Sequence, residues 1–214
     1  VAPDIGNCAD CPRLAAHLAE VRLRWPGYHA RPVAAFGDAA PRLLVVGLAP
    51  GLHGANRTGR PFTGDHAGIL LYETLYRFGF ANQPDGVDPD DGLALRDCRI
   101  TNAVKCLPPQ NAPTPAEVRT CNHHLRREIA ALPSVRVVLA LGAVAHGAVL
   151  SVFGKKAVAH RFAHGARYDL DAGPVLFDSY HCSRYNTQTR RLTADGFAAV
   201  FQAVRDELDI AGTA

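Results

Sequence analysis

The sequence lacks the features that would place it in a membrane or secreted class. No apolar run approaches the roughly 20 residues that a membrane-spanning helix needs, and the first residues, VAPDIGNCADCPR, contain no basic-then-apolar leader. Neither sign of charge dominates, because the formal net charge is only +3. With 214 residues, 48% of them hydrophobic, we expect one globular domain over 1–214, cytoplasmic and monomeric, with no membrane partner.

Two nucleotide-binding patterns are also absent. Residues 47–65, GLAPGLHGANRTGRPFTGD, are rich in glycine and follow an aliphatic run, as a phosphate-binding loop does. They contain neither the Gly-Lys-Ser/Thr of a Walker A loop nor a G-x-G-x-x-G fingerprint, which disfavours a nucleoside-triphosphate or NAD site. A plain surface turn does not account for the polar and aromatic side chains that crowd its second half: Asn56, Arg57, Arg60, Phe62 and Asp65.

The apolar spacing predicts an α/β fold, a three-layer sandwich whose four-stranded parallel sheet is flanked by helices. Thr114 and Glu117 form a capping-box pattern at the start of one helix. The predicted order is a helix over 12–24 and then four strand–helix pairs, with strands 42–47, 98–106, 135–142 and 174–181 and helices 67–80, 115–131, 143–153 and 194–209.

Three polar clusters fall at the carboxyl ends of these strands. They are 47–65, Asn102 in TNAVKC, and 181–193, HCSRYNTQTRRLT. Functional groups of parallel sheets gather at the carboxyl ends of the strands, so we expect these three clusters to form one site.

Four cysteines form two pairs that a fold could bring together. Cys8 and Cys11 make a C-x-x-C motif, and fourteen residues separate Cys106 from Cys121. Four thiolates suit a structural zinc or a [4Fe-4S] cluster, and their spacing does not separate the two; buried, unligated thiols are the third alternative. Cys98 and Cys182 have no such partner, and we expect them to be small buried side chains.

Together, the 47–65 motif, the 181–193 motif and these four cysteines resemble the iron-sulfur uracil-DNA glycosylases, most closely the broad-specificity branch called family 5 or type b. The resemblance runs from Cys8 to about Thr193. It implies the four-stranded parallel sheet of that superfamily, and it implies that the four cysteines hold a structural [4Fe-4S] cluster. The partner it implies is double- or single-stranded DNA with deaminated bases, in the nucleoid.

The resemblance also assigns roles to residues of the site. Most branches have Asp or Asn before the proline of the first motif, whereas this chain has Ala49, as is characteristic of type b. In that branch the catalytic aspartate lies further along the motif and matches Asp65. Residues that match the second motif and the substrate pocket of the family are His181 and Asn186 (catalytic) and Ala49, Gly51, Phe62 and Asn102 (substrate-binding).

Two further positions depart from the pattern of the family. The usual His-Pro-Ser is His181-Cys182-Ser183, and the usual Thr-Gly-Arg is Thr189-Arg190-Arg191. Loss of the proline could loosen the loop that carries His181.

Base excision leaves negative charge on the departing base and positive charge on the sugar. His181 can donate a hydrogen bond to a carbonyl oxygen of the base, and Asp65 can orient or deprotonate water and steady the sugar cation. Asp65 equally suits the N-cap of the helix that follows, and the two roles are compatible. Phe62 can stack on a flipped base, and Asn102 can read its Watson–Crick edge or satisfy backbone groups at the strand end.

The remaining polar residues of the two motifs are predicted to contact DNA. Gly51, Gly54 and Gly59 would let backbone N–H groups approach phosphates. The side chains assigned to DNA are His53, Arg57, Arg60, Ser183, Arg184, Tyr185 and Arg190, although exposed arginines are more often solvated than bound.

The sequence supports two functions of different kinds. The first is a monofunctional glycosylase that removes uracil, and with it deaminated purines such as hypoxanthine and xanthine, and leaves an abasic site. The alternative is a non-catalytic iron-sulfur nucleic-acid-binding module, because Ala49 replaces the usual polar residue. A zinc-stabilised nucleotide hydrolase is a weaker third option, since the phosphate motifs are missing.

Overall fold

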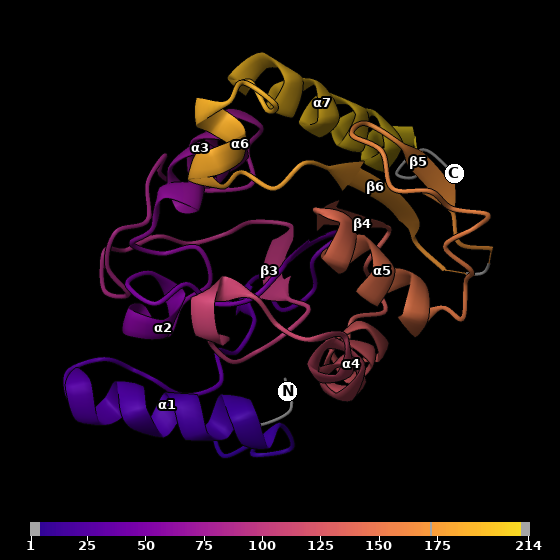
Figure 1. Cartoon of the computed structure of the whole chain (residues 1–214). Coiled ribbons are helices and arrows are strands. Elements are labelled where there is room, and N and C mark those ends of the chain that lie inside the picture. The colour runs from indigo at the N-terminus through magenta and orange to yellow at the C-terminus, as the bar shows by residue number, and fades with distance from the viewer. Residues whose placement is uncertain (1–4, 172, 211–214) are drawn as a thin grey trace.

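The computed structural model describes residues 5–171 and 173–210. Its elements alternate between helices and strands as the sequence predicts, and Figure 1 shows helices above and below a central sheet. In chain order they are α1 (Pro12–Arg24), β1 (Phe36–Gly37), β2 (Leu43–Gly47), α2 (Ala55–Thr58), α3 (His66–Arg77), β3 (Cys98–Asn102), η1 (Pro109–Asn111), α4 (Pro115–Ala130), β4 (Val137–Leu141), α5 (Ala143–Val152), β5 (Arg167–Asp169), β6 (Val175–Ser179), α6 (Arg184–Gln188) and α7 (Ala194–Ile210).

The sheet has six strands in the order β1-β3-β2-β4-β6-β5. The four central strands are parallel, which confirms the predicted parallel sheet, and β1 and β5 add short antiparallel edges that the prediction did not include. The edge strands have two and three residues and little burial, so their sequences carry no clear alternation.

Helices cover both faces of the sheet, as predicted. On one face α3 and α7 pack on alternate strand residues such as Val45 and Leu139, and on the other α4 and α5 pack on their neighbours Val46 and Ala140. The strands are apolar on both faces because both faces are buried. The predicted capping box is confirmed, since Thr114 and Glu117 each accept a hydrogen bond from the backbone N–H of the other.

The predicted strand 98–106 is wrong at its end, because β3 stops at Asn102. Beyond it the chain leaves the sheet: the Ala103 N–H donates to the Gly47 carbonyl, and the Lys105 N–H donates to Cys121 Sγ at 3.3 Å. The turn carries Cys106 away from the sheet toward α4.

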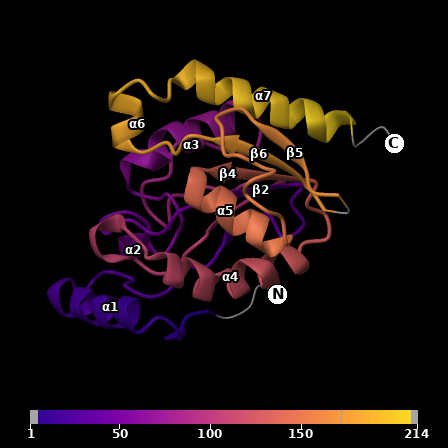
Figure 2. The same ribbon diagram turned by 45° about the vertical axis from the view of Figure 1, so that its right-hand side comes forward.

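The helix α1 lies outside the helical layers that cover the sheet, below α2 in both Figure 1 and Figure 2. Its buried residues Leu14, Leu18 and Val21 pack with Val104 and Leu107. No helix within the described part of the chain is long and apolar enough to cross a membrane.

Candidate active site and cysteine cluster

Two predicted pocket residues meet over a glycine at the carboxyl edge of the sheet. Gly47 ends β2 beside Asn102, the last residue of β3. A Cβ atom on Gly47 would lie 2.5 Å from Asn102 Oδ1 and 2.7 Å from Phe62 Cζ, so only glycine leaves room for both side chains. Gly47 is a site residue that was not predicted, although a glycine at the end of a buried strand is a signal for such a close approach.

Phe62 and Asn102 are both buried, and each has one unusual feature. Phe62 is 4% exposed and has a φ of +56°, a conformation that is rare for a bulky residue and often marks a functional site. Asn102 is 3% exposed, and its side-chain amide has no hydrogen-bond partner among the described residues. Its predicted role in satisfying backbone groups is therefore not observed, and the amide is available to a ligand.

His181 completes this group from the loop after β6. Its ring stacks on Phe62 with 5.8 Å between centroids and 27° between planes. Burial lowers the pKa of His181 to about 4, so the imidazole is neutral near pH 7. A neutral imidazole has one N–H to donate, which suits an interaction with a developing oxyanion.

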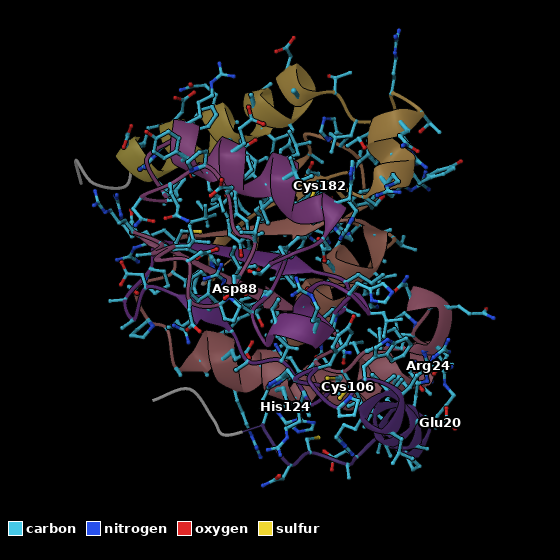
Figure 3. All side chains as sticks on the ribbon, turned by 90° about the vertical axis from the view of Figure 1, so that its left-hand side faces the viewer. Glu20, Arg24, Asp88, Cys106, His124 and Cys182 are labelled. Atoms are coloured by element: carbon cyan, nitrogen blue, oxygen red, sulfur yellow. The ribbon has the colours of Figure 1, made fainter. Side chains whose placement is uncertain are left out.

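Two neighbours hold the His181 loop. The Asn186 side chain donates from Nδ2 to the His181 carbonyl at 2.8 Å, and Cys182 is fully buried in the core (Figure 3). Cys182 is therefore packed in the core at the position where the family has proline, and the looser loop stays a prediction. Cys98 is also fully buried, as predicted.

Asp65 caps α3, which confirms the capping prediction. Its carboxylate accepts a hydrogen bond from the Gly68 N–H at 3.1 Å. A Cβ atom on Gly54 would lie 2.3 Å from Asp65 Oδ2, and one on Gly51 would lie 3.5 Å away. Burial raises the pKa of Asp65 above its ordinary value.

The carboxylate of Asp65 therefore occupies the space that the missing side chain of Gly54 leaves. Gly54 was predicted to let its backbone N–H approach a DNA phosphate, and that role stays a prediction. Gly59 has a φ of +77° and ends α2.

A surface pocket of about 570 Å³ gives access to Asp65. Its residues come from the glycine-rich loop, α3, the 84–87 turn and α6, and it does not reach Phe62, Asn102 or His181. The lining residues are Arg57, Gly64, Asp65, His66, Ile69, Glu73, Pro84, Asp85, Gly86, Val87 and Arg184.

The two sequence motifs are joined directly at this edge. His66 Nε2 lies 3.0 Å from Thr187 Oγ1, which ties the start of α3 to α6. This contact was missed because neither residue stands out in its motif. The short helix α6 was also missed, and the Ser183 side chain caps it by accepting from the Asn186 N–H at 3.5 Å.

The other predicted DNA contacts divide into surface and buried residues. Arg184, Tyr185 and Arg190 are exposed on or just after α6, and Tyr185 reaches 69% exposure. His53 is exposed at the turn before α2, and Arg57 Nε donates to its carbonyl at 2.8 Å. These five residues remain candidates for a DNA surface. Ala49 packs at the margin of the α1 cluster.

The prediction that Arg60 contacts DNA is wrong. Arg60 is 6% exposed, and its guanidinium pairs with Asp91 at 2.7 Å and donates to Thr63 Oγ1 at 2.7 Å. The guanidinium also lies over the ring of Phe36. All of its contacts are internal, so Arg60 stabilises the loop instead of facing a ligand.

The structure brings all four predicted metal-ligating cysteines to one small pocket. Cys8 and Cys11 come from the start of α1, Cys106 from the turn after β3 and Cys121 from α4. Burial and the nearby sulfurs raise the pKa of Cys106 to about 12, and burial raises that of Cys121 to about 11. Four thiolates would thus be unstable here without a bound cation.

Nitrogen and oxygen groups surround the sulfur atoms. His124 Nε2 lies 3.3 Å from Cys8 Sγ, and Figure 3 shows Cys106 and His124 together on the α1 side of the sheet. Ligand atoms of Cys8, Asp10 and His124 also lie within 4.8 Å of one another, so a mixed metal site overlaps the four-sulfur one. Sequence spacing did not reveal His124.

The arrangement defines a class of protein. A parallel sheet carries a neutral histidine, a half-buried aspartate, an unpartnered asparagine and an aromatic ring at its carboxyl edge, and residues 34–205 match the family described as "Uracil DNA glycosylase superfamily". The chain therefore belongs to the uracil DNA glycosylase superfamily.

Individual relatives place it more narrowly, in the type-5 family. The chain is 48% identical over 203 residues to the type-5 uracil-DNA glycosylase of Thermus thermophilus, with 92% of each chain covered. It is 45% identical to the one from Pyrobaculum aerophilum, covering 92% of this chain and 87% of the relative. A third, from Mycobacterium bovis, is 42% identical, with 94% and 78% covered.

Proposed function

We propose that the protein is a monofunctional DNA glycosylase that hydrolyses the N-glycosidic bond of uracil in DNA and leaves an abasic site. The observation that carries the proposal is the meeting of Phe62 and Asn102 over Gly47, with His181 stacked on Phe62 and Asp65 at the adjoining helix start. The relatives that share nearly the whole chain are named for this activity.

The reaction breaks the bond between C1′ of the sugar and the ring nitrogen of the base. The electron pair of that bond leaves with the base, and its negative charge spreads to the carbonyl oxygens. His181 donates its N–H to one of these oxygens, and a preorganised donor of this kind lowers the barrier by roughly 2.7 to 4 kcal/mol. Because His181 is neutral, it stabilises the leaving base by hydrogen bonding without transferring a proton.

The sugar is left with oxocarbenium character and must take up water. Asp65 orients a water molecule toward C1′ and accepts its proton as the new C–O bond forms, while its negative charge stabilises the sugar cation. The base anion takes a proton from solvent. A carboxyl group whose pKa is raised by burial is a better base than an exposed one, which supports this role for Asp65.

Phe62 and Asn102 select and hold the base. Phe62 offers an aromatic surface, and stacking contributes roughly 1 to 3 kcal/mol per base. The free amide of Asn102 supplies both a donor and an acceptor for the Watson–Crick edge. We extend the proposal to hypoxanthine and xanthine, because they present similar carbonyl edges, and to both single- and double-stranded DNA.

The cysteine site fits a [4Fe-4S] cluster, and we propose that Cys8, Cys11, Cys106 and Cys121 hold it. The Lys105 N–H donates to Cys121 Sγ, which supports this because such donors stabilise cluster sulfurs, and His124 Nε2 can donate to Cys8 Sγ in the tautomer that carries its proton there. The group would supply no chemistry to base release. Its role is structural, because it would fasten α1 and α4 to the turn after β3.

The experiment is release of the base from a uracil-containing duplex, scored by alkali nicking at the abasic site. We expect nicking by the purified protein and a strong loss of rate in His181→Ala with DNA binding retained. Salt-sensitive DNA binding with no release of uracil, hypoxanthine or xanthine would overturn the enzyme proposal in favour of a binding module. A colourless, zinc-containing protein from an anaerobic preparation would overturn the cluster proposal.

A further inference from the structure

The carboxyl-terminal end of α1 carries an aromatic cluster that the proposed mechanism does not use. Trp25, which caps α1, and Tyr28 pack at the margin of the α1 core beside Leu52 of the glycine-rich loop. Figure 1 shows α1 ending on the same side of the molecule as α2 and α6. This end of α1 therefore belongs to the face that holds the proposed active site.

The cluster fixes a guanidinium in place. Arg24, the last residue of α1, lies with its Cζ 4.5 Å from the centroid of the Trp25 ring, and Trp25 in turn stacks on Tyr28 at 5.7 Å with 14° between planes. An arginine held on an aromatic ring loses less conformational freedom when it binds an anion. Trp25 thus acts as a support for Arg24.

Arg24 has no ion-pair or hydrogen-bond partner among the described residues. Glu20, one helical turn earlier, lies 3.7 Å from His17 instead, and Figure 3 shows Glu20 and Arg24 on the exposed side of α1. Nearby Arg22, by contrast, donates to the Ala30 carbonyl. The charge of Arg24 is therefore free for a ligand.

His53 connects the cluster to the active-site loop. Its ring stands at 88° to those of Trp25 and Tyr28, and its Nδ1 lies 2.9 Å from the Tyr28 hydroxyl. When that hydroxyl donates to Nδ1, the ring proton sits on Nε2, which can then donate to an anion. Arg57, which lines the pocket of Asp65, is bonded to the His53 carbonyl.

We propose that Arg24 and the Nε2–H of His53, held by Trp25 and Tyr28, form a clamp for the sugar-phosphate backbone of the DNA strand that flanks the target base. The inference rests on the proposed function, because it places DNA at the pocket of Asp65. The Arg24 guanidinium and the His53 N–H are both held in place as donors, and neither is paired with a carboxylate, so both can bind negatively charged phosphates. In Figure 1, α1 lies below α2, whereas α6 lies above it.

The test measures binding to duplexes that carry a tetrahydrofuran abasic-site analogue, which the enzyme cannot turn over. The variants are Arg24→Gln, Arg24→Lys and Tyr28→Phe. The matched control is Arg77→Gln, because Arg77 is also the last residue of its helix, is exposed and lies over the ring that follows it. Arg77 lies at the far end of α3 from Asp65, away from the proposed DNA face.

We expect Arg24→Gln to weaken binding about fivefold at 0.15 M salt and to lower the slope of log K against log salt by about 0.9, the effect of one phosphate contact. Arg24→Lys should keep the slope, and Tyr28→Phe should weaken binding. The effect should appear only when the duplex is extended on one side of the analogue. The Arg77→Gln control should match wild type.

Equal salt slopes for Arg24→Gln and Arg77→Gln would overturn the clamp, and so would a loss that does not depend on which flank is extended. Uracil release by the wild-type protein is measured in parallel. If the wild type releases no base, the proposed function fails whatever the slopes show. If it releases base while Arg24→Gln binds like wild type, the clamp alone fails.

Discussion

Asp65→Asn separates the two roles that the structure combines in one side chain. An amide oxygen can accept the Gly68 N–H bond as the carboxylate does, and asparagine is as good an N-cap as aspartate. The amide cannot accept a proton from water, however. The substitution therefore preserves the start of α3 and removes the proposed base.

The variants should affect the melting temperature and the single-turnover rate differently. Asp65→Asn should leave the melting temperature near that of wild type, whereas Asp65→Ala, which removes the cap, should cost about 1 kcal/mol, or roughly 2 to 4 °C for a chain of this size. Both variants should lose about 10²- to 10⁴-fold in single-turnover rate, the usual contribution of a general base. Asp65→Ser gives a second capping residue without a carboxylate and should behave like Asp65→Asn.

The assay is single-turnover release of uracil from a labelled duplex, with thermal unfolding followed on the same preparations. Mass spectrometry confirms that the introduced amide has not hydrolysed back to a carboxyl group. If Asp65→Asn keeps a rate close to that of wild type, the carboxylate does not activate water and Asp65 acts only as a helix cap. Such a result would refute the mechanism and leave the fold unaffected.

Three further predictions follow from other contacts. Gly54→Ala should push the Asp65 carboxylate by about 1 Å and lower the rate about 10²-fold, whereas Gly27→Ala, which has nothing within 4 Å of its added methyl group, should leave the rate unchanged. Between pH 6.5 and about 4 the unfolded chain takes up a proton that native His181 does not, so the free energy of unfolding should decrease as the pH is lowered through this window. The decrease should be smaller in His181→Gln, and an equal pH dependence of the two proteins in urea unfolding would contradict the lowered pKa of His181. Arg60→Gln should lower the free energy of unfolding by about 3 kcal/mol, since it breaks a buried ion pair, while the salt dependence of DNA binding stays that of wild type.

The sequence predicts the central layers of this fold because their signals are local. The strand 43–47 is a short aliphatic run, and the capping box of Thr114 and Glu117 lies within a single helical turn. The end of β3 was predicted wrongly because the hydrogen bond that takes the Lys105 backbone out of the sheet is accepted by Cys121, which belongs to another element. The edge strands β1 and β5 were missed for a similar reason, since pairing with β3 and β6 defines them and their own few residues do not.

In the candidate site, too, the residues predicted correctly depend on local sequence signals, and the one predicted wrongly depends on a partner distant in the sequence. The convergence of Phe62, Asn102 and His181 was predicted because all three lie at or beyond the carboxyl ends of strands that share one edge. The role of Arg60 was predicted wrongly, because its partner Asp91 lies 31 residues further along the chain. A charge in a DNA-binding motif is indistinguishable in sequence from a charge paired inside the protein.

The glycine-rich loop shows why local patterns can be read in two ways. A phosphate-binding loop and this loop both use glycine to let an anion approach the backbone, but here the anion at Gly54 is the Asp65 carboxylate of the same chain. Burial raises the pKa of Asp65, while the amino-terminal dipole of α3 favours its ionised form. With Ala49 packed toward α1, the carboxylate that the proposed reaction needs comes from the start of α3, and Gly54 leaves the space for it.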